Sequence, residues 1–328
     1  MTGVASGKVA HRPGGGALLG VDIGGTKVAL RVEDGDRVLE KTFRWQEGDG
    51  SQADLDRLTA AIADLRAGTP APLTAMGVAL PATVSGGVVA AWPSRPGWAG
   101  LEIRERLRAM VGGAPVAIAD DGDLAALAES RAASCDDLVY VGVGTGIGGG
   151  IVLDGRPCPG PGRGSCELGH VVVALDGPRC TCGRRGCVQA IASGPAILAA
   201  AGRARGSPVS GPDLAAAGMG AHWARSPVER ASAALAAALV GVGELVRPSL
   251  VVVGGGFAAA VPGFTDEVAR HCAALARPGH VPAPVRPALL GGLSSLHGAV
   301  HAAAFARDGA RSVRDDVQQR TGGEPVAP

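Results

Sequence analysis

The sequence predicts an α/β protein built from two similar lobes with a cleft between them. Short apolar runs that suit strands alternate along the chain with segments of helical spacing. A strand, a glycine turn and a second strand open each half, around Gly24 and around Gly146. The length of 328 residues is sufficient for two separate cores.

Strands in the first half are expected where apolar residues run together or alternate with polar ones, and helices where they recur every three to four residues. The apolar run 75–80, for example, ends at Pro81, which cannot continue a buried strand. The expected strands are 17–30 (two strands around the turn), 38–45, 75–80 and 116–119, and the expected helices are 52–67, 101–111 and 124–133.

The second half follows the same rules and becomes mainly helical. Its expected strands are 138–142, 148–153 and 250–253, and its expected helices are 195–204, 212–217, 228–246, 263–275 and 298–307. We expect a small lobe over 17–120, to which the helix 298–307 returns, and a large lobe over 121–297. The Gly-rich segment 1–16 and the polar segment 308–328 are expected to be disordered tails.

The composition argues against several classes of protein. A formal net charge of +1 gives no sign of a nucleic acid partner. The chain has no apolar run of about 18 residues and no signal-peptide pattern, so neither membrane insertion nor export is expected. Of the seven cysteines, four are scattered, which fits a reducing compartment better than a disulfide framework. We therefore expect a cytoplasmic protein.

A cysteine cluster is the most informative local feature. Cys180, Cys182 and Cys187 fall within eight residues, and His170 stands ten residues before the first of them. Thiolates and imidazole are the ligands that structural Zn²⁺ prefers, and four of them complete a tetrahedral site. The alternatives are a disulfide with a spare thiol, or three unconnected buried cysteines. A zinc hydrolase is disfavoured, since four protein ligands leave no position for water.

Glycine-rich turns stand at three expected strand ends, at 24–26, 144–150 and 254–256. Without Cβ atoms, their backbone N–H groups can approach a phosphate closely. A single such turn is often only a hairpin, but three of them, two with Thr26 or Thr145, favour phosphate binding. An oxidoreductase is disfavoured because a strand-like segment, and not a helix, follows the turn at 144–150.

Three carboxylates are candidates for chemistry. Asp120 and Asp121 close a buried strand before an Ala-rich helix. One aspartate suffices to cap a helix, so the second is a candidate general base. Glu167, three residues before His170, either binds a ligand beside the cysteine cluster or is an ordinary surface carboxylate.

Six segments together resemble the ROK family of sugar kinases and sugar-responsive repressors, over about residues 17 to 307. These are L-G-V-D-I-G-G-T-K (19–27), A-D-D-G-D-L-A-A-L-A-E (119–129), G-T-G-I-G-G-G-I-V-L-D-G (144–155), E-L-G-H (167–170), C-T-C-G-R-R-G-C (180–187) and V-V-G-G-G (252–256). The resemblance implies a two-lobed actin-like ATPase (ribonuclease H-like) fold with a structural zinc loop. The repressors carry an N-terminal winged helix, for which the segment ahead of residue 17 has no room, so the kinase branch is favoured.

The resemblance also implies roles for individual residues. Asp121 matches the catalytic aspartate, which accepts the proton of the sugar hydroxyl as it attacks the γ-phosphate of ATP. Asp22 would help to hold Mg²⁺, whereas Glu167 and His170 match sugar-contacting positions. The positions implied for ATP and Mg²⁺ are Asp22, Gly24, Gly25, Thr26, Lys27, Thr145, Gly146, Gly254, Gly255 and Gly256. Relatives are often dimers, so a homodimer is expected.

Two positions that contact the sugar in relatives depart from the family pattern. The family usually has Asn-Asp where this chain has Asp120-Asp121, and Glu where it has Gln189. A carboxylate at position 120 suits an ammonium group, because a charge-assisted hydrogen bond contributes roughly 1.5–3 kcal/mol. We therefore predict phosphorylation of the 6-hydroxyl of an amino sugar such as kanosamine (3-amino-3-deoxyglucose).

Other substrates and another class of protein stay open. If Asp120 only bonds a hydroxyl, the substrate is glucose or a cyclitol. The competing class is a non-catalytic sugar sensor without a DNA-binding domain. The loops at Pro81-Ala82 and Pro93-Ser94 are expected to rim the sugar pocket, with Trp92 and Trp98 either covering the pocket or packing against their own lobe.

Overall fold

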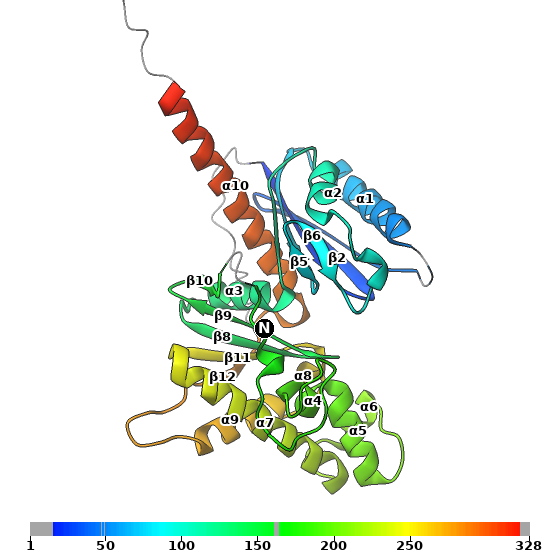
Figure 1. Cartoon of the computed structure of the whole chain (residues 1–328), viewed down its shortest axis with the longest axis vertical. Helices are drawn as coiled ribbons and strands as arrows, with labels where there is room; N and C mark the ends of the chain where they lie inside the picture. The colour runs from blue at the N-terminus through cyan, green and yellow to red at the C-terminus, as the bar shows by residue number, and fades with distance from the viewer. Residues whose placement is uncertain (1–15, 47, 49, 161–163, 322–328) are drawn as a thin grey trace, which may run out of the picture. The chain divides into compact units, whose positions relative to one another are not determined.

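The computed structural model describes residues 16–46, 48, 50–160 and 164–321 of the chain, with the side chains of the last helix up to residue 310. These residues divide into two compact units, shown in Figure 1. The small unit comprises 16–121 and 296–321, and the large unit comprises Gly122–Ser295. Most of the expected tail 1–16 and the end of the expected tail 308–328 lie outside the described residues.

The small unit is built on a five-stranded mixed sheet. In spatial order the strands are β3 (Arg37–Arg44), β2 (Lys27–Asp34), β1 (Ala17–Ile23), β4 (Leu73–Ala79) and β7 (Val116–Ala119). The strands β1, β2 and β3 pair antiparallel, whereas β4 and β7 continue the sheet parallel to β1. Almost every residue of β1 is buried, as expected for a strand that is covered on both faces.

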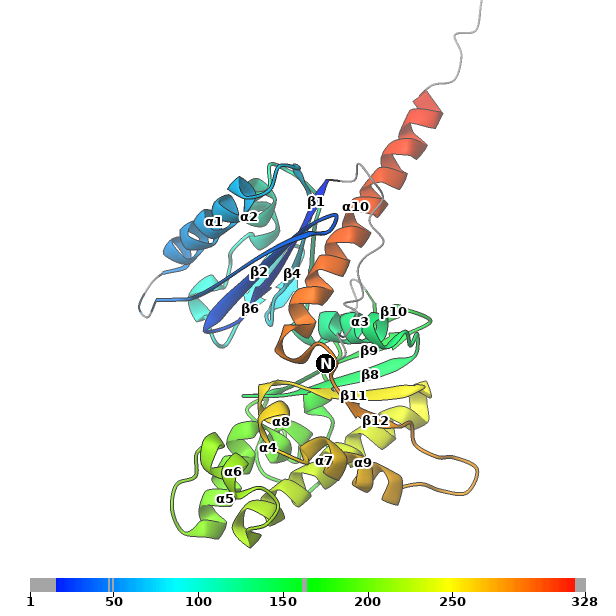
Figure 2. The same cartoon turned by 180° about the vertical axis from the view of Figure 1, so that it is seen from behind.

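Helices cover both faces of this sheet (Figures 1 and 2). The remaining elements are α1 (Ser51–Ala67), the hairpin β5 (Thr83–Ser85) and β6 (Val88–Ala91), η1 (Pro96–Trp98), α2 (Ile103–Met110) and α10 (Ser294–Thr321). Leu19 of β1 packs in the cluster with α1 and α2, whereas its neighbour Leu18 packs in the cluster with α10. At Gly77 a Cβ would lie 1.8 Å from the carbonyl oxygen of Ala299, so glycine allows α10 to approach β4 closely.

The large unit repeats the same sheet arrangement. In spatial order its strands are β10 (Arg156–Cys158), β9 (Ile147–Leu153), β8 (Leu138–Val143), β11 (Leu250–Gly254) and β12 (Val285–Pro287). The strands β8, β9 and β10 pair antiparallel, and β11 and β12 run parallel to β8. Two units with mixed sheets and covering helices confirm the predicted α/β class.

The helices of the large unit lie on the two faces of its sheet. They are α3 (Asp121–Ala133), η2 (Leu168–His170), α4 (Val188–Ala192), α5 (Gly194–Arg205), α6 (Gly211–Ala217), α7 (His222–Val246), α8 (Gly256–Ala260), α9 (Phe264–Ala274) and η3 (Gly291–Leu293). The helix α3 packs through Ala126 against Tyr140 on one face. On the other face, Val139 and Val251 join Leu235 of α7 in the largest core cluster.

Two helices are longer than the sequence predicts. The helix α7 begins at His222 and contains Pro227, because burial of Ala224 and Pro227 in the core stabilises its first turns. The helix α10 continues to Thr321, whereas the prediction ended it at Arg307 and expected a disordered tail. The segment 308–321 has one glycine and no proline, so little in it stops a helix. The short elements β5, β6, β10, β12, α4 and α8 are not predicted, since three to five residues show no reliable period.

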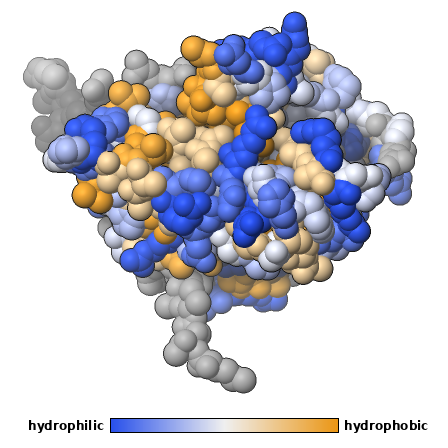
Figure 3. All heavy atoms as spheres, turned by 90° about the horizontal axis from the view of Figure 1, so that it is seen from below, coloured by the Kyte–Doolittle hydropathy of each residue, from blue (hydrophilic) through white to orange (hydrophobic). Residues whose placement is uncertain are grey.

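The surface of the described residues carries a mixture of polar and apolar side chains. Figure 3 shows hydrophobic residues interspersed with strongly polar ones on the face seen from below. Within the described part of the chain, no helix combines the length and the apolar character that a membrane crossing requires.

Candidate active site

The carboxylates predicted to act on ATP and sugar lie at the carboxyl ends of parallel strands in the small unit's sheet. Asp22 is the next-to-last residue of β1, and Asp120 and Asp121 directly follow β7. The register aligns Asp22 with Ala79, and Ala79 with Ala119. With parallel strands about 4.8 Å apart, Asp22 lies two strands, or roughly 10 Å, from the end of β7. Ligands of α/β proteins bind at such carboxyl ends.

The glycine turn between β1 and β2 opens at the same edge. The N–H of Gly24 donates to the carbonyl oxygen of Lys27 at 2.9 Å and closes the turn. Gly25 lies within the turn, and the side chains of Thr26 and Lys27 are exposed. The structure therefore groups Asp22, the turn and Asp120-Asp121 in the small unit.

The second predicted phosphate turn joins β8 to β9 in the large unit. The N–H of Gly144 donates to the carbonyl oxygen of Gly146 at 2.9 Å, and Thr145 at the tip is exposed. The carbonyl oxygen of Gly144 also accepts from the N–H of Gly194, at the start of α5, at 2.8 Å. These contacts hold a tight turn whose tip faces solvent.

Gln189 of α4 supports this turn from the side of the cysteine loop. Its Oε1 atom accepts a hydrogen bond from the N–H of Ile147 at 3.0 Å. A Cβ at Gly146 would lie 2.9 Å from the same oxygen. The side-chain oxygen of Gln189 thus contacts the turn between β8 and β9, a contact that the sequence does not predict.

Gly254 ends β11 beside the end of β8, Gly255 follows it, and Gly256 begins α8. Gly254 pairs with Gly142 in the parallel register, so both glycine segments leave the sheet at one edge. Gly255 has a φ of +88°, and a Cβ there would lie 2.4 Å from the backbone of Val143. Only glycine combines this conformation with this close approach.

The cysteine loop brings the four predicted zinc ligands together. Nδ1 of His170 and the sulfurs of Cys180, Cys182 and Cys187 are arranged so that the four ligand atoms lie within 4.8 Å of one another. The backbone folds through a bridge between Val172 and Cys187 and a hydrogen bond from the N–H of Cys180 to the carbonyl oxygen of Arg184 at 2.8 Å.

The distances in this cluster fit one tetrahedral ion. The sulfurs of Cys182 and Cys187 are 3.7 Å apart, as are Sγ of Cys180 and Nδ1 of His170. With Zn–S bonds of about 2.3 Å, tetrahedral geometry separates two sulfurs by about 3.8 Å. The cysteines are free thiols and form no disulfide among the described residues. The donor set and its spacing therefore suit Zn²⁺.

The acidities of the thiols differ in the same cluster. Burial and hydrogen bonds with Cys182 and Cys180 raise the pKa of Cys187 to about 11. A backbone hydrogen bond at Arg184 lowers the pKa of Cys182. Metal ligation requires deprotonated sulfurs, so binding of a Zn²⁺ ion here would release the protons of these thiols.

Glu167 lies beside the second nitrogen of His170. Its Oε2 atom is 3.9 Å from Nε2 of His170, and its Oε1 atom accepts from Oγ of Ser165 at 2.8 Å. The imidazole thus presents Nδ1 to the cysteines and Nε2 toward an exposed carboxylate. This arrangement places the two predicted sugar-contacting residues next to each other.

Other predicted pocket residues lie in the core. Trp92 and Trp98 are 2% and 1% exposed and stack edge to face, with ring centroids 4.9 Å apart. They pack against their own unit, which favours the second of the two predicted roles.

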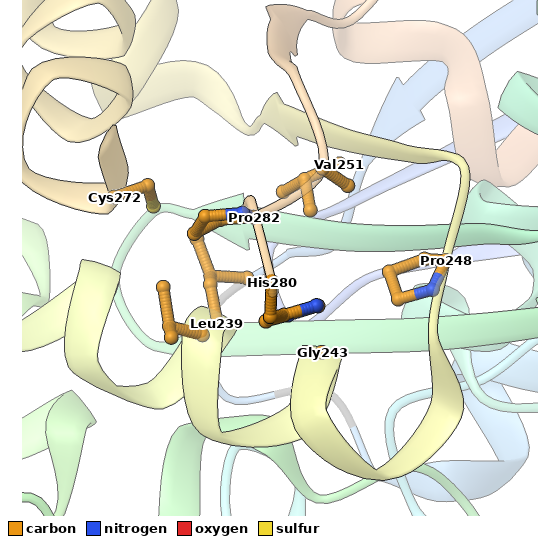
Figure 4. A pocket seen from close by; sticks show the side chains of 9 residues that line it. Leu239, Gly243, Pro248, Val251, Cys272, His280 and Pro282 are labelled. Carbon is orange, nitrogen blue, oxygen red and sulfur yellow. The ribbon is translucent and has the colours of Figure 1, made fainter. Parts of the chain in front are cut away.

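A small apolar cavity in the large unit is separate from these residues (Figure 4). Leu239 of α7, Val251 of β11 and Cys272 of α9 line it, together with His280. Its free volume of about 10 Å³ holds at most one water molecule, so it cannot take a sugar or a nucleotide.

Comparisons with known proteins agree on one family. The model of the ROK family matches residues 18–306. The chain is 53% identical to the kanosamine kinase of Amycolatopsis mediterranei (strain S699) over 285 residues, which cover 86% of this chain and 94% of that protein. It is 32% identical to the glucokinase of Thermotoga maritima over 266 residues, which cover 74% and 83% of the two chains.

Solved structures give the same result. The ROK hexokinase from Thermus thermophilus has a TM-score of 0.79 at 31% identity, covering 89% of this chain and 99% of that chain. A ROK family glucokinase from Streptomyces griseus, in complex with glucose and AMPPNP, has a TM-score of 0.74 at 28% identity, covering 89% and 100%.

Proposed function

Because the chain belongs to the ROK family and is an ATP-dependent sugar kinase, we propose that it phosphorylates the 6-hydroxyl of a kanosamine-type amino sugar. Its fold matches that of the ROK sugar kinases, the actin-like ATPase fold. The observation that carries the choice of substrate is the 53% identity to a kanosamine kinase over 86% of the chain.

Asp121 is the proposed general base. The carboxylate accepts the proton of the 6-hydroxyl while the 6-oxygen attacks the γ-phosphorus of ATP. The bond from that phosphorus to the β,γ-bridging oxygen breaks, and the products are the sugar 6-phosphate and ADP. Phosphoryl transfer depends mainly on positioning and charge neutralisation, so one base and well-placed donors suffice.

The two glycine turns are the proposed phosphate-binding elements. The first turn would act through Gly24, Gly25, Thr26 and Lys27, and the second through Thr145 and Gly146. Both turns follow strand ends, where backbone N–H groups can point toward an anion. The segment 254–256 would lie along the adenosine, where the backbone can approach closely. Mg²⁺ held near Asp22 would neutralise charge on the phosphates.

Asp120 is the proposed determinant of the amino sugar. It directly follows β7 and immediately precedes the proposed base, so it would contact the C3/C4 side of the sugar ring while Asp121 contacts the 6-hydroxyl. A carboxylate pairs with an ammonium through a charge-assisted hydrogen bond of roughly 1.5–3 kcal/mol, which corresponds to about a 10- to 100-fold preference.

The cysteine cluster is proposed to hold a structural Zn²⁺ that orients His170. With Nδ1 on the ion, Nε2 and the neighbouring Glu167 would face the sugar. Gln189 is a proposed sugar-contacting residue through its amide nitrogen, since its oxygen contacts the turn at Ile147. A homodimer and a cytoplasmic location stay predictions.

The test is ADP release by the purified protein with kanosamine, glucose, glucosamine, N-acetylmannosamine and a cyclitol. We expect the highest kcat/KM with kanosamine. The Asp120→Asn variant should shift the kanosamine-to-glucose ratio of kcat/KM toward glucose by about 10-fold or more. An unchanged ratio would contradict the role of Asp120, and the absence of ADP release with every sugar tested would favour a non-catalytic sensor.

A further inference from the structure

A buried ion pair between Asp54 and Arg95 lies next to the β1–β2 turn in the small unit. Asp54, in the first turn of α1, is 1% exposed, and its Oδ2 atom accepts from Nη1 of Arg95 and from Nε1 of Trp98 at 2.8 Å. Its Oδ1 atom is buried without a hydrogen-bond partner. Burying a charged pair is unfavourable unless its geometry is held well by further contacts.

Arg95 extends from this pair to the backbone of the turn. Its Nε atom donates to the carbonyl oxygen of Gly25 at 3.3 Å. The residue before it, Ser94, is so close that a Cβ at Gly25 would lie 2.8 Å from Cβ of Ser94. The loop expected to rim the sugar pocket therefore contacts the turn expected to bind phosphate.

Trp45 makes the second contact with the turn. Its indole Nε1 donates to the carbonyl oxygen of Gly24 at 2.8 Å, and its backbone N–H donates to the carbonyl oxygen of Thr26 at 3.1 Å. The guanidinium of Arg95 stacks on its ring, 4.6 Å from the centroid. Arg95 and Trp45 thus donate hydrogen bonds to consecutive carbonyl groups of one turn, and their side chains also stack on each other.

These contacts fix the direction of the N–H groups in the turn. A peptide unit is planar, and in the trans form its C=O and N–H point in opposite directions. Bonding the carbonyl of Gly24 orients the N–H of Gly25, and bonding the carbonyl of Gly25 orients the N–H of Thr26. Both N–H groups must then point away from Trp45 and Arg95.

We infer that Arg95, held by Asp54 and stacked on Trp45, is a positioning residue that preorganises the β1–β2 turn for the phosphates of ATP. This inference rests on the proposed function, because it assigns the turn to ATP. A turn without these bonds would have to be ordered during binding, and a small misplacement of reacting groups lowers the rate by up to about 100-fold.

The test compares Arg95→Met with Arg31→Met. Arg31 is a matched control, since it belongs to the same unit, is similarly buried (11% against 14% exposed) and forms an ion pair with Glu33 at 2.6 Å. Its pair lies on β2, away from the turn residues 24–26. Both variants are measured for the KM of ATP, the KM of the sugar, kcat, and thermal unfolding.

We expect Arg95→Met to raise the KM of ATP by about 5-fold or more and to lower kcat, with the KM of the sugar within about 2-fold. Arg31→Met should leave all three within about 2-fold. Equal effects of the two variants would overturn the inference. A wild-type protein inactive with every sugar would instead overturn the proposed function.

A second variant tests the inference even if Arg95→Met does not fold. Trp45→Phe retains a ring for Arg95 but removes the donor to Gly24, and Trp223→Phe, in the large unit, is its control. Loss of one hydrogen bond predicts a rise in the KM of ATP of about 2- to 10-fold for Trp45→Phe and no change for the control. An unchanged KM of ATP in Trp45→Phe would also contradict the inference.

Discussion

Glu129 of α3 binds the segment that leads into α10, and the variant Glu129→Gln tests how much this contact stabilises the protein. Its carboxylate is completely buried and accepts three hydrogen bonds. The N–H of Leu289 donates to Oε2 at 2.8 Å, and the N–H of Leu290 (3.0 Å) and Oγ of Ser294 (2.7 Å) donate to Oε1. Glu129 lies on α3, and Ser294 begins α10, the two helices at which the units divide.

The magnitude follows from these three bonds. Glutamine preserves the shape, and its amide oxygen can replace Oε1, but its NH₂ group then faces the N–H of Leu289. One charge-assisted hydrogen bond is lost and the N–H of Leu289 is left buried without an acceptor. The other two hydrogen bonds remain but are no longer made to a charged group. We expect the free energy of unfolding to fall by about 2–4 kcal/mol. For a chain of 328 residues the Tm should fall by roughly 3–6 °C.

The assay is thermal and urea unfolding followed by circular dichroism. Glu40→Gln is the control, because Glu40 is 45% exposed and its surface ion pair with Arg31 is worth about 1 kcal/mol or less. If Glu129→Gln were as stable as this control, the reasoning about the buried carboxylate would be refuted.

Three further variants test the rest of the site. Cys187→Ser should reduce bound zinc from about one ion per chain to near zero and lower the Tm, whereas zinc retained at wild-type stoichiometry would contradict the tetrahedral site. Gly255→Ala should abolish activity or folding, because a Cβ would lie 2.4 Å from the backbone of Val143; a fully active variant would contradict the close approach. Gln189→Leu should raise the KM of ATP by about 2- to 10-fold through loss of the bond to Ile147, and an unchanged KM of ATP would show that this bond does not support the turn.

Much of the fold could be predicted because its signals are local. The strands β1, β8 and β11 are short apolar runs, and each ends at a glycine segment that needs no knowledge of the rest of the chain. The cysteine cluster is equally local, since its four candidate ligand residues fall between 170 and 187.

The residues that support the site could not be predicted in the same way. Arg95 contacts Asp54 across 41 residues and Gly25 across 70, and Glu129 contacts Leu289 across 160. Nothing in the local sequence distinguishes Asp54 from an ordinary acidic residue in the first turn of a helix. Such partners are found only when tertiary packing brings the segments together.

The most direct test of the central claim is the kcat of Asp121→Asn for ADP release with the preferred sugar. Asparagine keeps the shape of the side chain but cannot accept the proton of the hydroxyl. We predict a fall in kcat of about 100-fold or more, with the Kd values of sugar and ATP within a few-fold of wild type. A variant that keeps its kcat would contradict the assignment of this carboxylate as the base.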